Sequence, residues 1–231
     1  MKKILLTIAM LFIALSANAE FILVESPTTM ENFWQRNGKT AEKVLTVGRK
    51  LIHDNELKRV PIVLANQNVK RATSDLYYKT VTIYPGMLLY TNSDDELAFI
   101  LGHEIAHSQE AYDGAIKLMA MSFNSKKYEY KSDLKAIDYM VKSGYNPVSA
   151  ILVGDKIFEE PLWDWGVFST HPRGSKRLMA MYGYIYKKYP QYLNSQLAKT
   201  NAFVDFMKQN QKEISSYQQK QAKKNKKTLD L

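Results

Sequence analysis

Apolar and polar residues follow a helical period over most of the chain. Helical patterns cover residues 32–56, 93–107, 126–143, 148–159, 173–188 and most of 191–221. Two short stretches, 60–64 and 80–83, instead have the apolar character of strands. The pattern therefore predicts an α+β fold that is mostly helical and contains a small sheet.

The helix that begins after Ser93 has the pattern of a buried element. Ser93 and Glu96 have the spacing of an N-terminal capping box, and Asp94 and Asp95 add negative charge to the first turn. The helix is apolar on nearly every face, and Gly102 would let another element approach it closely. A helix with so little polar surface is expected to lie at the centre of the fold.

The one polar face of this helix carries the pentapeptide His103-Glu104-Ile105-Ala106-His107. Residues four apart lie above one another on a helix, so the two imidazoles can reach a single point. Two neutral nitrogen ligands suit Zn²⁺, and the adjacent Glu104 could take a proton from a water beside the metal. The motif predicts a hydrolase, most simply a peptidase, with His103 and His107 as metal ligands and Glu104 as the base.

A catalytic zinc usually has a third protein ligand, and Glu129 is the best candidate for it. Glu129 and Asp133 lie one turn apart on the next helix, on a face that also carries Ala136 and Ile137. Burying two carboxylates is costly unless they bind a cation or accept hydrogen bonds. Glu129 would therefore bind the metal and Asp133 would accept from a ligating imidazole. The alternative is that Glu129 pairs with a lysine such as Lys126 on a wet surface.

Several segments carry a family resemblance that is more specific than any one motif. Leu97–His107 resembles Leu-x-x-(Val/Ile)-Leu-(Ala/Gly)-His-Glu-x-x-His, Glu129–Asp133 resembles Glu-x-x-Ala-Asp, Ser143–Pro147 resembles Ala-Gly-Tyr-Asp-Pro, and Ser169–Pro172 with Arg177 resembles Thr-His-Pro followed by Arg. These patterns, in this order, are those of gluzincin zinc metallopeptidases of the HtpX, BepA, Oma and CAAX prenyl protease type. The chain resembles a soluble, exported member of that group.

The resemblance implies a zincin-like fold with an active-site helix, a ligand helix packed on it and a small antiparallel sheet with an edge strand above the cleft. One Zn²⁺ per chain would be held by His103, His107 and Glu129, with Glu104 as the catalytic base. His171 would reach the cleft and either assist the oxyanion or bind the metal in a latched state; the alternative is an ordinary loop histidine. Arg177 would hold the region of Asp133 together.

The sequence departs from the family pattern beside the cleft. Residues 74–78, Ser-Asp-Leu-Tyr-Tyr, stand where the family often has Asn-Ala-Phe, which leaves substrate preference open. We expect a substrate to add as a strand beside residues 80–83, so that its backbone supplies much of the affinity. Trp163, Trp165 and Phe168 either line the cleft or pack in the core.

The first 19 residues have the features of an export signal. Two lysines precede an apolar stretch that is short for a membrane span, and Ala-Asn-Ala ends at Ala19. The alternative is an uncleaved membrane anchor. The chain has no cysteine, so neither a lipid-modified cysteine nor a disulfide is available. We therefore expect a periplasmic protein with one metallopeptidase domain, residues 20–207.

The positive charge is concentrated in the last segment, residues 208–231. The formal net charge is +9, and this tail has seven lysines against Glu213 and Asp230. Such a tail could touch the anionic envelope weakly, or it could be a solvated end. Export argues against a nucleic-acid partner, and the oligomeric state is left open.

The resulting prediction is a zinc-dependent endopeptidase of the bacterial envelope. It would cleave extended or misfolded polypeptides in protein quality control. The alternative is a latched or non-proteolytic chaperone or scaffold that contains zinc. Four protein ligands around the metal, with no open position, would favour that alternative.

Overall fold

The computed structural model describes residues 27–65, 67–114, 117, 119, 121, 124–158 and 174–229. The predicted signal segment 1–19, His171 and the aromatic residues of 163–168 lie outside the described residues. The elements in chain order are α2 (Pro27–Asp54), β1 (Ile62–Leu64), β2 (Ala72–Asp75), β3 (Thr80–Ile83), α3 (Pro85–Leu88), α4 (Asp94–Ala111), α6 (Ser125–Lys142), α7 (Val148–Ile157), α8 (Gly174–Lys188), the 3-10 turns η1 (Pro190–Asn194) and η2 (Leu197–Lys199), α9 (Asn201–Gln209) and α10 (Gln211–Leu229).

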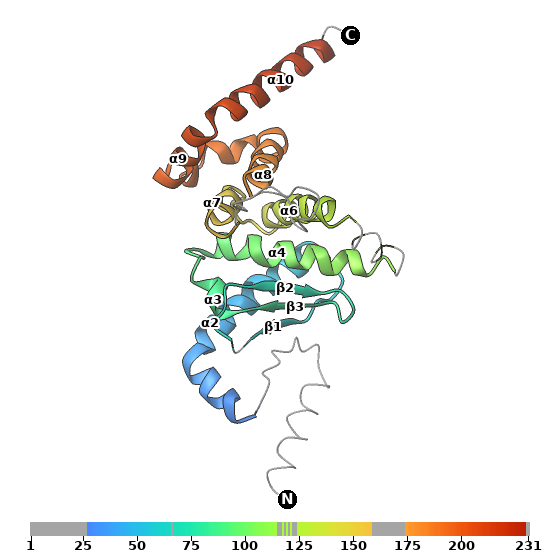
Figure 1. Cartoon of the computed structure of the whole chain (residues 1–231), viewed down its shortest axis with the longest axis vertical. Coiled ribbons are helices and arrows are strands. Elements are labelled where there is room, and N and C mark those ends of the chain that lie inside the picture. The colour runs from blue at the N-terminus through green and yellow to red at the C-terminus, as the bar shows by residue number, and fades with distance from the viewer. Residues whose placement is uncertain are drawn as a thin grey trace, which may run out of the picture.

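Helix α4 divides the fold into two layers. The three-stranded sheet lies on one side of it, and α6 and α7 lie on the other (Figure 1). Apolar side chains on the rear of α4, such as Leu97, Leu101 and Ile105, are fully or almost fully buried in the core. The prediction of a mostly helical α+β fold with a central, buried histidine helix is confirmed.

The sheet is mixed, so the prediction of an antiparallel sheet is only half right. Its order is β1-β3-β2, with β1 parallel and β2 antiparallel to β3. Strands β2 and β3 form a hairpin, and β3 also pairs with β1. Strand β3 therefore lies between the other two. Three- and four-residue strands carry too little pattern to specify that pairing.

Because β3 is the central strand, the expectation that a substrate adds beside residues 80–83 is wrong. Both edges of β3 are already paired. In the described part of the chain, β2 pairs on one side only and is the edge strand next to α4. The residues of β2 carry little local sign of a strand, since Ala-Thr-Ser-Asp lacks the apolar alternation of a half-buried strand.

Helix α4 starts where the polar residues around Ser93 predicted. The Ser93 hydroxyl accepts a hydrogen bond from the Glu96 backbone N–H at 3.2 Å, while the Glu96 carboxylate accepts one from the backbone N–H of Asn92 at 2.6 Å. Glu96 also binds Lys156 of α7, with Nζ–Oε distances of 2.7 and 2.8 Å. The cap therefore fixes both the start of α4 and its position against α7.

Helices α4 and α6 are in close contact at Gly102, as predicted. A Cβ added to Gly102 would lie 3.3 Å from both Cα and Cβ of Ala136 on α6. A side chain at this position would force the two helices apart by a few tenths of an ångström, so glycine favours the observed separation. The close approach matters because α4 carries the histidines and α6 carries Glu129.

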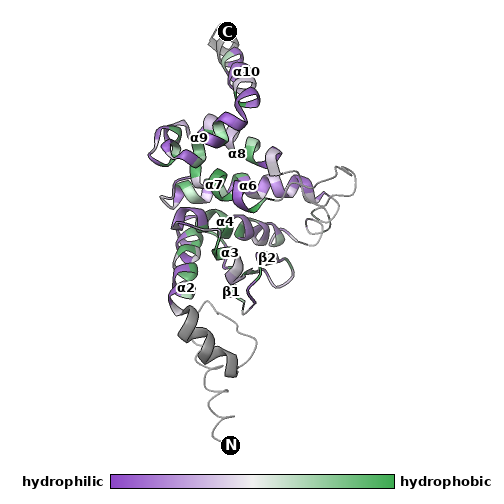
Figure 2. Cartoon of the chain, turned by 60° about the vertical axis from the view of Figure 1, so that its left-hand side comes forward, coloured by the Kyte–Doolittle hydropathy of each residue, from purple (hydrophilic) through white to green (hydrophobic). Residues whose placement is uncertain are grey.

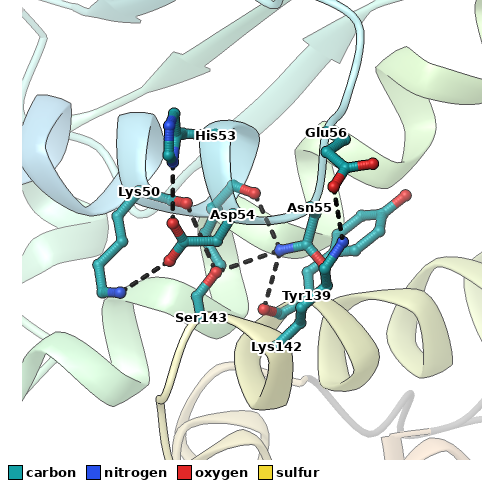
Figure 3. A network of polar contacts seen from close by, with 9 residues as sticks. Lys50, His53, Asp54, Asn55, Glu56, Tyr139, Lys142 and Ser143 are labelled. Atoms are coloured by element: carbon teal, nitrogen blue, oxygen red, sulfur yellow. Dashed lines mark hydrogen bonds and ion pairs between the residues drawn. The ribbon is translucent and has the colours of Figure 1, made fainter.

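The far end of α6 is fixed by its own cap and by the end of α2. Gly144 has φ +77°, and the backbone N–H of Tyr145 donates to the carbonyl of Met140 at 2.8 Å, as in a Schellman motif. Figure 3 shows Asn55, just after α2, reaching across to α6: its amide donates to the Tyr139 carbonyl and the Ser143 hydroxyl, each at 3.1 Å. The ligand helix is thus held at the end remote from the site.

Helix α10 differs from the core helices in composition. Figure 2 shows α7 as largely hydrophobic and α10 as largely hydrophilic. Ile214 and Tyr217 attach its first half: Ile214 is buried, and the Tyr217 hydroxyl donates to the Gly183 carbonyl of α8 at 2.9 Å. Among the described residues, no helix combines the length and the apolar composition that a membrane span requires.

Candidate metal centre

Three potential ligand atoms from α4 and α6 converge on one point. The Nε2 atoms of His103 and His107 lie 3.1 Å apart. The carboxylate of Glu129 lies 3.3 Å from His107 Nε2 and 3.6 Å from His103 Nε2. All three side chains are largely buried, with 11%, 11% and 12% of their surfaces exposed. The three residues that the sequence singled out as a metal site therefore form a group that could hold an ion.

The spacing of these atoms fits zinc. Nitrogen and carboxylate oxygen ligands lie about 2.0–2.2 Å from a tetrahedral zinc, which puts neighbouring ligand atoms about 3.4 Å apart. The observed separations of 3.1–3.6 Å bracket that value. A cation between two neutral imidazole nitrogens and a carboxylate held this close together would compensate the cost of burying them. The donor set of two imidazoles and one carboxylate is also that of a catalytic zinc site with room for a water.

Asp133 and Arg177 support this group from behind. Arg177 of α8 donates from Nε and Nη2 to the two carboxylate oxygens of Asp133, at 2.8 and 2.6 Å. Its third nitrogen, Nη1, lies 3.0 Å from Oε2 of Glu129. Asp133 Oδ1 also lies 2.9 Å from Nδ1 of His103, although this contact is not aligned as a good hydrogen bond. One guanidinium thus orients both acidic residues of α6.

The electrostatics of this cluster keep Asp133 ionised. Burial raises the pKa of Asp133, but the Arg177 guanidinium outweighs that effect and holds the pKa below its ordinary value. Burial lowers the pKa of His103, but Asp133 and Glu129 outweigh it, so the pKa lies above its ordinary value. An ionised Asp133 beside Nδ1 would keep the proton of His103 on that nitrogen and leave Nε2 free as a ligand.

The group opens into a cavity of about 380 Å³. Its lining combines residues of β2, apolar side chains and the polar cluster. The lining residues are Ala72, Thr73, Ser74, Leu76, Met87, Phe99, Ile100, His103, Glu104, His107, Glu129, Ile157, Phe158 and Arg177. Phe158 at the end of α7 covers Arg177, with its ring centroid 3.9 Å from the guanidinium carbon. The mixture of an apolar wall and a few convergent polar groups is typical of a small-molecule or peptide site.

Glu104 lines the same cavity, one residue after His103 on α4. It is therefore on the open side of the site, where a base would meet a water and a substrate. His53, which matched no motif, is exposed at the end of α2, contacts Asp54 at 3.0 Å and does not line this cavity (Figure 3). His171 lies outside the described residues, so its role stays a prediction.

Three features of the site were not predicted from the sequence. Arg177 was assigned to the region of Asp133, but its second contact, with Glu129, was not foreseen. Phe158 was not identified, because its place at a helix end gives no signal beyond an apolar residue after Ile157. The third feature is the direction of the β2 backbone groups, which follows from the strand register.

Among the described residues, the β2 register leaves the backbone groups at two positions without a strand partner. Alternate residues of an antiparallel strand bond to the neighbour, and the Tyr84 N–H donates to the Arg71 carbonyl at 3.1 Å. Thr73 and Asp75 continue that bonded series opposite Thr82 and Thr80. The backbone N–H and C=O groups of Ala72 and Ser74 therefore point to the unpaired edge, and both residues line the cavity.

A helical fold with a small sheet, whose buried helix presents two histidines and meets a glutamate from a second helix, is the arrangement expected of a zincin-like fold. Residues 41–119 match the family model described as Peptidase family M48. The match covers less than half of the chain and supports the predicted resemblance to a zinc metallopeptidase family over that segment. The matched residues include both histidines and Glu104, and Glu129 follows them on α6. No curated protein and no solved structure matched the chain.

Proposed function

We propose that this protein is a zinc-dependent endopeptidase that cleaves extended or misfolded polypeptides in the bacterial envelope. The observation that carries the proposal is the convergence of His103, His107 and Glu129 on one point in a cavity that Glu104 also lines. The match to a peptidase family supports the same chemistry. The metal is proposed to be zinc because of the donor set and its spacing.

Each polar residue of the cluster has a distinct part in the proposed reaction. When bound, zinc would lower the pKa of a water and polarise the scissile carbonyl. Glu104 takes the proton from the attacking water and then delivers it to the leaving nitrogen. Asp133 lies beside Nδ1 of His103 and would keep the ring proton there, and Arg177 orients Asp133 and Glu129, so the ligands need little reorganisation during the reaction. His171 stays a predicted helper or latch.

The substrate is proposed to bind as an added strand along β2 rather than beside β3. The backbone groups of Ala72 and Ser74 face the unpaired edge and lie in the wall of the cavity. Pairing with them would hold a polypeptide in an extended form and would recognise its main chain rather than a terminus. This mode suits an endopeptidase, and it favours unfolded segments because folded ones have their backbone groups already paired.

The proposed location is the periplasm, and it rests on the sequence of residues 1–19. The lysine-rich tail is proposed to have at most weak contact with the anionic envelope, since the positive charge is spread along the hydrophilic helix α10. Protein quality control is the biological setting that fits cleavage of unfolded chains in that compartment.

The test is Glu104→Gln in purified protein that has been loaded with zinc. Cleavage of an unfolded protein substrate should fall by at least about 100-fold, because the general base is lost, while one zinc per chain remains bound. Glu56→Gln is the matched control, because Glu56 is 87% exposed at the end of α2, and its activity should be unchanged. Full turnover by Glu104→Gln would refute the proposed mechanism. Unfolded-chain binding without any cleavage by the unsubstituted protein would favour the chaperone alternative.

A further inference from the structure

The turn that follows the edge strand β2 presents two tyrosine rings to solvent. Tyr77 is 79% exposed and Tyr78 is 72% exposed, and they are the two most exposed aromatic residues among those described. Their ring centroids lie 4.9 Å apart in an edge-to-face arrangement. Two adjacent exposed rings are unusual on a surface that binds nothing, because each offers a large apolar area.

The turn is built to hold these rings in place. The carboxylate of Asp75 accepts hydrogen bonds from the backbone N–H groups of Tyr77 and Tyr78, at 2.8 and 2.7 Å. Lys79 closes the turn in the left-handed region, at φ 55°, and its Nζ lies 5.1 Å from the ring centroid of Tyr112. Because Tyr112 directly follows α4, the turn is anchored to the C-terminal end of that helix, the end nearer the second histidine.

The two rings are also continuous with the cleft. Ser74 and Leu76, which directly precede them, line the cavity that contains the candidate metal centre. The strand ends at Asp75, and Tyr77 and Tyr78 lie in the turn that directly follows it. A polypeptide paired with the outward backbone groups of Ala72 and Ser74 would therefore pass the turn that carries the rings where it leaves the strand.

We propose that Tyr77 and Tyr78 form a docking platform for an apolar or aromatic side chain of an extended polypeptide substrate. The platform deepens the proposed function and rests on it. The platform contacts the bound chain away from the scissile bond. Together with the pairing along β2, it selects segments that are both extended and apolar. Such segments are buried in folded proteins and become accessible when a protein misfolds.

A polypeptide fits this surface better than a membrane or a second copy of the chain. The rings continue a strand edge whose backbone groups face outward, and only another extended chain satisfies both features at once. Tyrosine rings also bind side chains at a low entropic cost, since each has two rotatable bonds and these are presented by a fixed turn. The platform should therefore contribute to substrate affinity and leave the chemical step unchanged.

The experiment compares two peptides with the same cleavable centre, one short and one extended on both sides by about four residues that include Phe and Leu. Binding is measured by fluorescence anisotropy on zinc-loaded Glu104→Gln protein, and kcat and KM are measured on protein with Glu104 intact. The double variant Tyr77→Ser with Tyr78→Ser should weaken binding of the long peptide about tenfold and raise its KM about tenfold, with kcat unchanged. The short peptide should bind both proteins equally.

Two control variants sharpen the result. Tyr77→Phe with Tyr78→Phe keeps both rings and should retain affinity for the long peptide. Val204→Ser removes an exposed apolar side chain on α9, 37% exposed, and should change nothing. Equal affinity of the serine variant and the unsubstituted protein for the long peptide would overturn the platform, as would an equal loss for both peptides.

Two further measurements distinguish a polypeptide from a second copy of the chain and from a membrane. One outcome is that the serine variant changes the sedimentation coefficient or the binding to anionic vesicles, while its affinity for the long peptide stays equal to that of the unsubstituted protein. In that case the rings serve a second copy or a membrane, and the proposal is wrong. Failure of the proposed function would look different, because the unsubstituted protein would cleave neither peptide. Anisotropy on the Glu104→Gln protein would still report on the platform in that case.

Discussion

Helices α4 and α6 bury two clusters of charge one turn apart, and the clusters are satisfied in opposite ways. At Glu110, the carboxylate of α4 is 1% exposed and is met by three lysines: Lys117 at 2.9 Å, Lys131 at 2.7 Å and Lys135. At the candidate metal centre, two imidazole nitrogens and the carboxylate of Glu129 converge at separations of 3.1–3.6 Å. The carboxylate of the first cluster is paired with lysines, whereas the second cluster combines one guanidinium with three potential metal ligands.

A structural ion cluster differs in this way from a site that needs a ligand. A buried carboxylate is tolerated where cations donate to it, as at Glu110. Arg177, which also lines the cavity, provides that compensation for Asp133 and for one oxygen of Glu129. His103, His107 and Glu129 also bring three potential metal-ligand atoms together, which the lysine-paired carboxylate of Glu110 does not. We therefore expect the two clusters to respond differently to substitution, to acid and to zinc.

The largest effect is expected from Arg177→Met. It would leave Asp133 and Glu129 buried without their cation, and breaking such a pair costs about 3–5 kcal/mol of unfolding free energy. Zinc should restore part of this loss, since it compensates Glu129 but not Asp133. Denaturant unfolding with zinc and with a chelator measures both values. Arg177→Lys should not rescue stability fully, because an ammonium lacks the planar fork that binds both oxygens of Asp133 while a third nitrogen reaches Glu129. Unchanged stability in Arg177→Met would contradict this interpretation of the cluster.

The Glu110 cluster should lose less, and its loss should depend on pH. Glu110→Gln removes the shared partner of three partly exposed lysines, which can then be solvated, and should cost about 2 kcal/mol at neutral pH. Burial raises the pKa of Glu110, but the lysines outweigh it and lower the pKa to about 2 from an ordinary 4.5. The stabilisation is therefore complete above pH 4.5 and is lost as the pH falls toward 2.

Unfolding free energies measured from neutral pH down to about pH 2 test this window. The unsubstituted protein should lose stability more steeply than Glu110→Gln below about pH 4.5. Asp113→Asn is the matched control, since Asp113 is 54% exposed and shares Lys117 with Glu110; it should change stability only slightly. Parallel curves for the unsubstituted protein and Glu110→Gln would mean that the lysines do not compensate this carboxylate.

A smaller effect is expected where the two helices touch. Gly102→Ala places a Cβ 3.3 Å from Ala136 and must push α6 outward by a few tenths of an ångström. The gain in helix propensity partly offsets this strain, so the net cost should be about 1 kcal/mol. Because Glu129 moves with α6, zinc affinity should fall as well. Breaking the ion pairs of Glu110, in contrast, should leave zinc affinity unchanged. The double variant Gly102→Ala with Ala136→Gly should recover most of the zinc affinity; if it recovers none, the separation of the helices does not set the ligand geometry.

The features that local sequence dictates were the ones predicted correctly. The start of α4 follows from Ser93 and its acidic neighbours, the end of α6 from Gly144, and the shared face of the two histidines from their spacing of four. Predicting that Glu129 meets the histidines also required that α6 packs closely on α4, and Gly102 indicated such a close contact. These elements depend on contacts within a few residues or on one close helix contact.

The features that depend on long-range pairing were not predictable. The parallel pairing of β1 with β3, and hence the edge position of β2, depends on register between strands of three or four residues. The meeting of Arg177 with Glu129 joins two distant parts of the sequence through the path of α8. Glu110 had the pattern of an ordinary charged helix residue, and nothing local indicated that three lysines would surround it.

The most direct test of the central claim is a zinc titration of the metal-free protein by competition with a chromophoric chelator. The unsubstituted chain and Glu110→Gln should each bind one zinc ion per chain. Glu129→Gln should bind zinc at least about 100-fold more weakly, a larger loss than the roughly 10–100-fold effect of an outer partner such as Asp133. Equal zinc affinity for Glu129→Gln and the unsubstituted chain, or no zinc binding by either, would contradict the assignment of this cluster as a metal centre.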